Sequence, residues 1–437
     1  MAERVQHFDV LVIGAGPAGL AAARAAASHG VRVGVVDMQP RAGGQVWRND
    51  VRHGAPADAR AMLRQVSGDA SIALLTRTQI LLAQPGWLLA DGPDGTLQLH
   101  YAALVLATGA RELLLPFPGW TLPGVTGAGA AQALTKQGWP LAGKRVVVAG
   151  SGPLLLASAA TLQRHGARVL GIYEQTCAAA LRQFALQLWR WPGKAAQAVA
   201  LRVQLRAVAY RAGNVVVAAH GDTQLREVAI EGPTGSTLIA CDQLAVGYGL
   251  VPNTELAQLL GCRLEACGAH QQVHVDTLLR TSVTQVYAAG EVCGIGGRDC
   301  ALIEGAMAGH MAADASDAAL RLQPRRRAAR AFAQLLQQQF ALHPRIRTLA
   351  QPDTLICRCE DVPLGALDSF SDARDAKLAS RCGMGACQGR ICGTALAELG
   401  RCPPELSTDA GRRPPLFPVR LAALADSFTS DSQGNHP

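Results

Sequence analysis

The sequence has few aromatic residues, no long hydrophobic run and no cysteine near its N-terminus. Aromatic side chains make up 4% of the 437 residues, so the hydrophobic cores must be built mainly from Ala, Val and Leu. Every stretch of about 18 or more apolar residues is interrupted by a charge, Gly or Pro, so no membrane-spanning helix is predicted. The first cysteine is Cys177, which excludes the evenly spread disulfide framework of a small secreted protein.

Hydrophobic residues account for 49% of the chain, which is enough to form several buried cores. At roughly 150 residues per domain, the length predicts about three domains. The apolar start, residues 8–16, contains an acid and glycines, so we interpret it as a strand and turn instead of a signal peptide. We therefore expect a cytoplasmic protein, with peripheral binding to the inner face of a membrane left open.

The net charge is +8, but only four of the 41 basic residues are lysines. The densest basic cluster is Arg325–Arg327 together with Arg330, and no aromatic residue is interleaved with it. Because nucleic-acid binding usually combines basic and aromatic side chains on one surface, we predict no nucleic-acid partner. The cluster is instead expected to be a solvated linker or a patch that contacts an acidic partner.

A glycine-rich turn near the N-terminus predicts a dinucleotide site. Residues 9–13 form a predicted strand, residues 14–19 are Gly-Ala-Gly-Pro-Ala-Gly, and an Ala-rich helix and a second strand lead to an acid. The first glycine makes the turn, the second lets the backbone approach a pyrophosphate, and the third lets helix and strand pack. The helix N-terminus offers N–H groups to phosphate. The predicted binding residues are Gly14, Gly16, Pro17, Ala18, Gly19 and Asp37.

Further segments resemble the glutathione- and thioredoxin-reductase-like flavoproteins, which contain two dinucleotide-binding domains. Residues 41–45 follow the acid, residues 104–110 are a strand that ends in Ala-Thr-Gly-Ala, and residues 286–291 are a strand that ends in Gly-Glu. The resemblance implies that the dinucleotide is FAD, although the usual Asp at the last position is Glu here. The residues that it adds to the FAD site are Arg41, Gly44, Gln45, Thr108, Gly109, Gly290 and Glu291.

A second strand, glycine turn and helix are inserted between these segments. The turn contains Gly150 and Gly152, and Glu174 ends the following strand. The third position of the motif is Leu155, where Gly or Ala is usual, so we expect an intact fold with a distorted phosphate turn. The candidate ligand is NAD(P) or another nucleotide, with NADP disfavoured because Glu174 would repel its 2′-phosphate. The alternative is a vestigial turn that binds nothing.

Six of the twelve cysteines lie between residues 357 and 402. Four thiolates satisfy a [2Fe–2S] cluster, whereas zinc sites usually pair cysteines across about two to four residues, which a Cys-x-Cys motif does not match. We therefore predict a [2Fe–2S] cluster, with zinc or free thiols as the alternatives. Cys382 and Cys402 are spare, and Cys382 is an alternative to Cys387. The predicted ligands are Cys357, Cys359, Cys387 and Cys392.

The cysteine module resembles the bacterioferritin-associated-ferredoxin-like [2Fe–2S] domain. With Pro-Phe-Pro-Gly-Trp at 116–120 and Gly-Met-Gly-Ala-Cys-Gln-Gly-Arg at 383–390, the whole chain resembles the FAD-containing α subunits of opine oxidases, D-hydroxyproline dehydrogenases and hydrogen cyanide synthase. This resemblance implies a partner β subunit similar to D-amino-acid oxidases, together with a separate electron acceptor. It leaves open an FMN at the interface between subunits and a small ferredoxin-like subunit.

The predicted fold class is α/β, with two Rossmann-like domains of the glutathione-reductase type and a small helical C-terminal [2Fe–2S] domain. The expected domains are an FAD domain (1–115 and 275–320), an inserted NAD-type domain (116–274), a linker (321–350) and the cluster domain with a tail (351–437). The expected function is electron transfer within a heteromeric amine or imino-acid dehydrogenase. The alternative is a stand-alone NAD(P)H-dependent reductase of a ferredoxin or small acceptor. No histidine is a clear base, so no catalytic residue is predicted.

Overall fold

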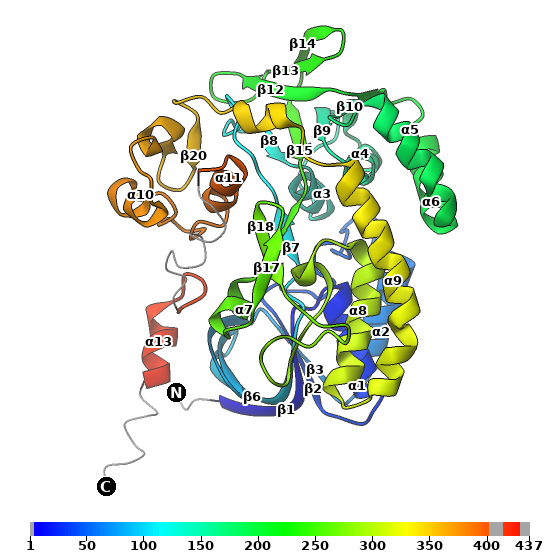
Figure 1. Ribbon diagram of the computed structural model, residues 1–437, viewed down its shortest axis with the longest axis vertical. Helices are drawn as coiled ribbons and strands as arrows, with labels where there is room; N and C mark the ends of the chain where they lie inside the picture. The colour runs from blue at the N-terminus through cyan, green and yellow to red at the C-terminus, as the bar shows by residue number, and fades with distance from the viewer. Residues whose placement is uncertain (1–3, 402–413, 429–437) are drawn as a thin grey trace. The chain divides into compact units, whose positions relative to one another are not determined.

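The computed structural model describes residues 4–401 and 414–428 and divides the chain into two units (Figure 1). The described residues of unit 1 are 4–111, 252–331 and 414–428. Those of unit 2 are 112–251 and 332–401. Each unit is therefore assembled from segments that are far apart in the sequence.

Unit 1 contains a sheet with the strand order β3-β2-β1-β6-β5-β4, in which β19 also pairs with β6. Strands β1, β2, β3, β6 and β19 are parallel, whereas β4 and β5 extend the sheet in antiparallel fashion. Residues 10–13 of β1 and 103–106 of β6 are apolar and buried, as expected where both faces of a parallel sheet are covered. The strand bounds are β1 Arg4–Ile13, β2 Val33–Asp37, β3 Ile72–Thr76, β4 Gln79–Gln84, β5 Trp87–Gly92, β6 Gly95–Leu106 and β19 Val286–Ala288.

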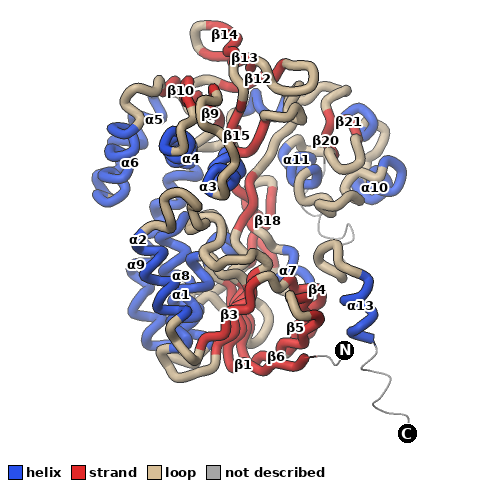
Figure 2. The backbone as a smooth tube through the Cα atoms, turned by 180° about the vertical axis from the view of Figure 1, so that it is seen from behind, coloured by secondary structure: helices blue, strands red, loops and turns tan. Residues whose placement is uncertain are grey.

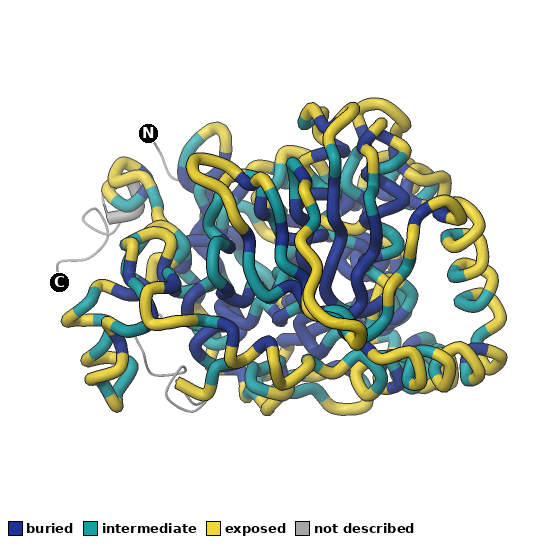
Figure 3. Tube along the Cα trace, turned by 90° about the horizontal axis from the view of Figure 1, so that it is seen from above, coloured by how far each residue is buried: buried dark blue, intermediate teal, exposed yellow. Residues whose placement is uncertain are grey.

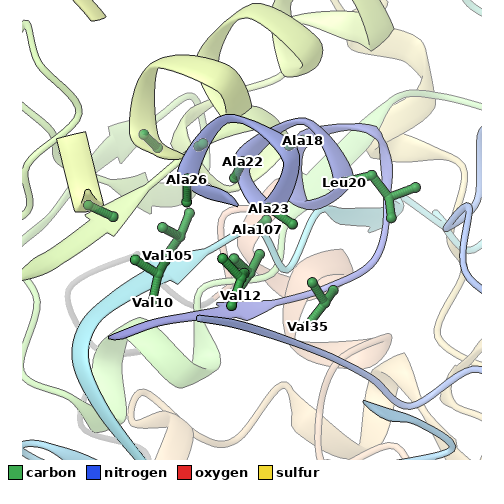
Figure 4. Packing of buried hydrophobic residues seen from close by; sticks show 14 of the residues in the cluster. Val10, Val12, Ala18, Leu20, Ala22, Ala23, Ala26, Val35, Val105 and Ala107 are labelled. Carbon is green, nitrogen blue, oxygen red and sulfur yellow. The ribbon is translucent and has the colours of Figure 1, made fainter. Parts of the chain in front are cut away.

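Helix α1 (Pro17–Ala27) packs on this sheet through small side chains. Figure 4 shows alanines of α1 above valines of β1, β2 and β6. Helix α8 (Gly297–Ala312) lies beside α1 (Figure 2), so close that a Cβ on Gly305 would lie 2.0 Å from the Ala18 carbonyl oxygen. Close backbone packing thus fills the space that a core with more aromatic residues would fill with rings.

The remaining elements of unit 1 include helices, short strands and the described C-terminal segment, residues 414–428. The Leu416 N–H donates to the Leu81 carbonyl oxygen at 3.0 Å, and the Thr96 hydroxyl donates to the Ala423 carbonyl oxygen at 3.3 Å. These bonds attach residues 414–428 to β4 and β6. The bounds are α2 Ala57–Ser67, α7 Glu255–Leu259, β17 Leu264–Cys267, β18 His270–Val273, η2 Gly290–Cys293, α9 Ser316–Gln339 (which continues into unit 2) and α13 Leu421–Phe428.

Unit 2 contains a parallel sheet with the order β11-β10-β9-β15-β8 and an antiparallel sheet with the order β12-β13-β14. The strand bounds are β8 Val125–Gly127, β9 Arg145–Gly150, β10 Arg168–Glu174, β11 Tyr210–Ala212, β12 Val215–His220, β13 Glu227–Gly232, β14 Gly235–Ala240 and β15 Gln243–Gly247. The helix bounds are α3 Ala128–Lys136, α4 Leu154–Arg164, α5 Ala178–Gln187, η1 Leu188–Arg190 and α6 Pro192–Gln204. Strands β7 (Ala110–Glu112) and β16 (Leu250–Pro252) carry the chain out of unit 1 and back.

The cysteine-rich segment belongs to unit 2 and has a small core of its own. That core contains Ile356, Val362 and Leu396 together with three of the cysteines. Trp120 attaches it to the rest of the unit, because its ring N–H donates to the Leu355 carbonyl oxygen at 2.7 Å. The bounds are η3 Pro344–Thr348, β20 Leu355–Cys357, β21 Val362–Pro363, η4 Leu364–Leu367, α10 Ala373–Ser380 and α11 Cys392–Glu398.

The predicted α/β class is confirmed, but the units divide the chain at other points than the predicted domains. The chain returns to unit 1 at Pro252 and not at residue 275, because α7 and β18 pack in the unit 1 core. The predicted linker 321–350 is mostly helical, since α9 continues through Pro324. Residues 414–428 belong to unit 1 and not with the cysteine module. Figure 3 shows buried positions gathered in the interior and exposed positions along outer loops and helical coils. None of the described helices is both long and apolar enough to cross a bilayer.

Candidate functional site

The first glycine turn lies between β1 and α1 and requires glycine at both of its ends. Gly14 has φ +106°, and a Cβ there would lie 2.3 Å from the Ala107 carbonyl oxygen. A Cβ on Gly19 would lie 1.7 Å from the Gly14 carbonyl oxygen, so only glycine lets α1 begin this close to the strand. Gly16 precedes the first helical residue, Pro17, and the N–H groups of Ala18 and Gly19 lie in the first turn of the helix. The predicted residues thus form the phosphate-approach geometry of a dinucleotide turn.

Asp37 ends β2 beside this turn. Its carboxylate accepts the Ala15 N–H and the Gln39 N–H, each at 2.7 Å. Burial raises the pKa of Asp37, although the two N–H groups and the nearby Arg48 guanidinium act in the opposite direction. The carboxylate is thereby held at the place where a dinucleotide fold accepts from a ribose hydroxyl.

The loop that reaches the first turn carries two buried donors without a partner, which fit a ligand rich in acceptors. The ring N–H of Trp47 and the Nε–H of Arg48 are buried and have no hydrogen-bond partner among the described residues. The loop of residues 41–45 reaches the first glycine turn, because a Cβ on Gly44 would lie 2.8 Å from the Gly16 Cα. Gln45 accepts from Arg48 at 2.8 Å. Since buried polar groups are normally paired, the orphaned donors support the presence of a bound polar ligand here. Arg48 was not predicted, and only its position after the acid could have identified it.

The structure places the other predicted FAD residues in unit 1 as well. The Thr108 hydroxyl donates to the Asn253 carbonyl oxygen at 2.7 Å, which fixes the strand end before Gly109. A Cβ on Gly290 would lie 2.9 Å from the Ala18 Cβ, so the Gly-Glu turn lies against the start of α1. Glu291 accepts the Gly297 N–H at 2.7 Å, and its other carboxylate oxygen is buried without a partner among the described residues. Burial raises the pKa of Glu291. For Arg41 the described contacts give no role.

The sequence did not predict the ion-pair network that supports this turn. Glu304 of α8 is fully buried and is bonded by Arg326 at 2.9 Å and Arg330 at 2.7 Å. It also accepts the Gly290 N–H at 3.2 Å. The expectation of a solvated linker or acidic-partner patch at Arg325–Arg330 is therefore wrong for Arg326 and Arg330. Helical spacing places both guanidinium groups on one side of α9, facing the buried acid.

The second glycine turn lies between β9 and α4 and has an intact fold. Gly150 has φ +131°, and a Cβ there would lie 1.9 Å from the Gly247 carbonyl oxygen. Leu155 is fully buried in the apolar core of this part of unit 2, so the bulky residue at the third motif position packs without disrupting the fold. Glu174 is fully buried and accepts from Gly152 N–H at 2.7 Å, Thr176 N–H at 2.9 Å and the Tyr210 hydroxyl at 3.3 Å. Burial raises its pKa.

The segment that follows α9 lies on this second turn. A Cβ on Gly152 would lie 3.7 Å from the Phe340 ring, and the Ser151 hydroxyl donates to the Phe340 carbonyl oxygen at 3.2 Å. Gln175 fixes both ends of the segment, donating to Ala341 at 3.1 Å and accepting from the His343 N–H at 2.9 Å. Residues 340–343 therefore lie against the backbone of the second glycine turn.

Five cysteines gather in the C-terminal part of unit 2. The thiols of Cys357, Cys382 and Cys392 are buried and lie within 4.8 Å of one another. Cys387 is in hydrogen-bonding contact with the thiols of Cys359 and Cys392, and these contacts with nearby backbone N–H groups lower its pKa. A lowered thiol pKa favours the thiolate that a metal needs. All four predicted ligands are thus in one place, together with Cys382, while Cys402 lies outside the described residues.

Comparisons with known proteins agree with this architecture. A family model described as pyridine nucleotide-disulphide oxidoreductase matches residues 8–315. An opine oxidase subunit from Rhizobium meliloti (strain 1021) is 34% identical over 461 aligned positions, covering 96% of this chain and 98% of that protein. The hydrogen cyanide synthase subunit HcnB from Pseudomonas protegens is 31% identical over 474 positions, covering 98% and 99%.

Two solved structures share the fold. L-proline dehydrogenase from P. horikoshii aligns with a TM-score of 0.69 at 19% identity, covering 97% of this chain and 80% of that chain. Thioredoxin reductase from T. acidophilum aligns with a TM-score of 0.53 at 22% identity, covering 71% and 99%. The predicted resemblance to the opine oxidase and hydrogen cyanide synthase subunits is confirmed.

Proposed function

Since the chain belongs to the pyridine nucleotide-disulphide oxidoreductase family, as a relative of HcnB and of opine oxidase subunits, we propose that it is the FAD-containing, electron-transferring subunit of a heteromeric amine or imino-acid dehydrogenase. The observation that carries this proposal is that Phe340–His343 cover the second glycine turn. A chain with one usable dinucleotide turn has a place for a flavin but none for a nicotinamide donor. Its electrons must then come from another polypeptide.

The first turn would hold the FAD through groups of this chain. The N–H groups of Ala18 and Gly19 begin α1 and would face the pyrophosphate, where the helix dipole favours negative charge. Asp37 would accept from a ribose hydroxyl, and the unpartnered donors of Trp47 and Arg48 would bond other acceptors of the ligand. Glu291 would present its free carboxylate oxygen to a ligand hydroxyl.

The cysteine centre would hold a [2Fe–2S] cluster in the same chain. A flavin supplies two-electron acceptance and such a cluster supplies one-electron transfer, so their pairing connects two-electron oxidation to a one-electron acceptor. Support comes from three buried thiols within 4.8 Å of one another, those of Cys357, Cys382 and Cys392, and from Cys387, which contacts Cys392 and Cys359. Zinc at the same thiols is the alternative that metal analysis separates.

Thiol–disulfide chemistry at the flavin is not supported by the cysteines of unit 1. Cys293 and Cys300 lie in and directly after the Gly290 turn, and both are buried. Burial raises the pKa of Cys300 to about 12 and also raises the pKa of Cys293 well above its ordinary value. The thiol form is a poor nucleophile, so these residues are expected to be packing groups and not a redox pair.

The partner would be a flavoprotein subunit similar to D-amino-acid oxidases, which removes hydride from the amine. Support comes from the relatives, which are named as subunits of opine oxidase and of hydrogen cyanide synthase. A small ferredoxin-like subunit, an FMN at the interface between subunits and a separate electron acceptor complete the proposed assembly. A cytoplasmic location is part of the same proposal.

Anaerobic reduction of the full chain, purified alone, tests this function. NADH, then NADPH, then dithionite are added while flavin absorbance and the electron paramagnetic resonance of the metal centre are followed. We expect that neither nicotinamide bleaches the flavin and that dithionite reduces both centres. Rapid bleaching by NADH would instead establish the stand-alone reductase. A series of D-amino acids and opines, added with the purified partner, then identifies the substrate.

A further inference from the structure

We propose that Cys382 is a fifth cysteine of the metal centre and replaces Cys359 as a ligand when that thiolate is lost. The proposal rests on the [2Fe–2S] cluster proposed above. A [2Fe–2S] cluster takes four protein ligands, whereas this site gathers five thiols. Which thiol is surplus is decided by the burial and the contacts of the five side chains.

Cys382 lies in the interior of the site. Its thiol is within 4.8 Å of those of Cys357 and Cys392, and all three residues are buried. They come from three elements, because Cys357 ends β20, Cys392 begins α11 and Cys382 follows α10. Three thiols that converge this closely from separate elements could act together as metal ligands. Packing alone would not require sulfur at each of the three positions.

Cys359 lies at the opposite, outer side of the group. It is exposed, and its described thiol contact is with Cys387, which in turn contacts Cys392. Cys359 is held there by the loop, since a Cβ on Gly385 would lie 2.3 Å from the Cys359 Cβ. An exposed thiolate is the ligand most open to oxidation or protonation by solvent.

The backbone brings Cys382 to the site by a defined turn. Arg381 ends α10 in the left-handed region with φ +65°, and the Cys382 N–H donates to the Ser380 hydroxyl at 3.2 Å. The Arg381 side chain bonds Glu360 at 2.7 Å. This ion pair joins the residue before Cys382 to the residue after Cys359. The loops that carry Cys359 and Cys382 are therefore connected to each other.

The exchange is a ligand substitution without electron transfer. Cys382 would take the place of Cys359 among the four residues that hold the cluster. The Cys382 thiol would release one proton and the Cys359 thiolate would take one up, so no group would be oxidised or reduced. The charge of the centre is therefore unchanged, and only the position of one ligand shifts from the exposed to the buried side.

Iron and acid-labile sulfide per chain, with electron paramagnetic resonance after dithionite, test the proposal in the full-length protein. The variants are Cys359→Ser, Cys382→Ser and the double variant. Cys357→Ser is the control for an essential ligand, and Cys241→Ser is the control for a buried thiol outside the site. Circular dichroism confirms that each variant is folded.

We expect each single variant at positions 359 and 382 to keep about two irons per chain, with shifted g values for Cys359→Ser. The double variant and Cys357→Ser lose the iron, while Cys241→Ser matches wild type. Loss of iron in Cys359→Ser, or its retention in the double variant, would overturn the exchange while leaving the cluster in place. Wild-type protein without iron and sulfide would overturn the proposed cluster, and the exchange with it.

Discussion

The first glycine turn, at Gly14–Gly19, and the second, at Gly150–Leu155, each join a buried parallel strand to a helix beside an acid that ends the next strand. At the first turn, donors of Trp47 and Arg48 are buried without partners among the described residues. At the second, Phe340 lies on Gly152, and Glu174 is bonded by three donors of its own unit. The loop beside the first turn therefore leaves two donors without partners, whereas at the second turn the acid is satisfied internally and the nearby Thr176 hydroxyl is the buried group without a partner among the described residues.

The two buried acids beside these turns differ in the charge of the groups that bond them. Glu304, beside the first turn, is balanced by two arginines, whereas Glu174, at the second, is surrounded by neutral N–H and O–H donors. A buried charge pair costs most when one partner is removed, because the other charge is left buried. Loss of a neutral hydrogen-bond acceptor costs less.

The largest expected effect follows from this difference. Glu304→Gln leaves Arg326 and Arg330 partly buried without their counter-charge, so we expect the free energy of unfolding to fall by about 3–5 kcal/mol. Urea denaturation measures it. The control is Glu231→Gln, which breaks an exposed pair with Arg345 at 3.4 Å and is expected to cost roughly 0–1 kcal/mol. Equal effects of the two variants would show that burial of Glu304 is not what stabilises the Gly290 turn.

The next effect separates ligand binding from stability. Gly14→Ala and Gly150→Ala both place a Cβ against a carbonyl oxygen, at 2.3 and 1.9 Å, at positive φ. Each is expected to cost about 1–3 kcal/mol from backbone strain alone. Flavin absorbance per chain should fall to a small fraction of wild type only in Gly14→Ala. Gly30→Ala is the control, with positive φ but open space around the Cβ. Flavin loss in Gly150→Ala would contradict the assignment of the FAD to the first turn.

Sequence reasoning reached the strands, both glycine turns and the cysteine cluster because these features depend on residues close together in the chain. Gly14, Asp37 and Gly150 occupy the predicted places for that reason. The contacts that it missed join distant segments. Glu304 meets Arg330 across two helices, and Phe340 meets Gly152 from the end of α9. A basic run looks the same in sequence whether it faces solvent or a buried acid, so burial decided its role.

The predicted cysteine ligands show the same limit. Spacing along the chain selected Cys359 and Cys387, since each pairs with a nearby cysteine in sequence. Cys382 stands at the same spacing from Cys387 as Cys387 does from Cys392, so spacing did not separate the two candidates, and the turn after α10 brings the Cys382 thiol to Cys357 and Cys392. Ligation by residues from separate elements is set by tertiary packing, which spacing alone does not describe.

A smaller effect concerns the pH dependence of the second turn. Burial raises the pKa of Glu174 above its ordinary value of 4.5, so the folded state keeps a proton that the unfolded state releases. Stability from this group therefore falls as pH rises from 4.5 through the raised pKa. Glu174→Gln removes this dependence and is expected to cost about 1–3 kcal/mol for the lost acceptors. Urea denaturation at several pH values should show the advantage of wild type over the variant largest at acid pH. A difference that is constant with pH would contradict a raised pKa.

The smallest expected effect tests the cover on the second turn directly. Phe340→Ala removes the ring from Gly152 and is expected to cost about 1 kcal/mol, because the side chain is only partly buried. Phe332→Ala is the matched control, since Phe332 contacts Trp191 and Lys194 away from the turn. Calorimetric titration with NADH should detect no binding to wild type or Phe332→Ala and weak binding to Phe340→Ala. Binding to wild type would mean that residues 340–343 yield to the nucleotide. If none of the three proteins binds NADH, the ring of Phe340 is not what prevents binding. The bonds of Gln175 to the segment and the bulk of Leu155 would then be its cause.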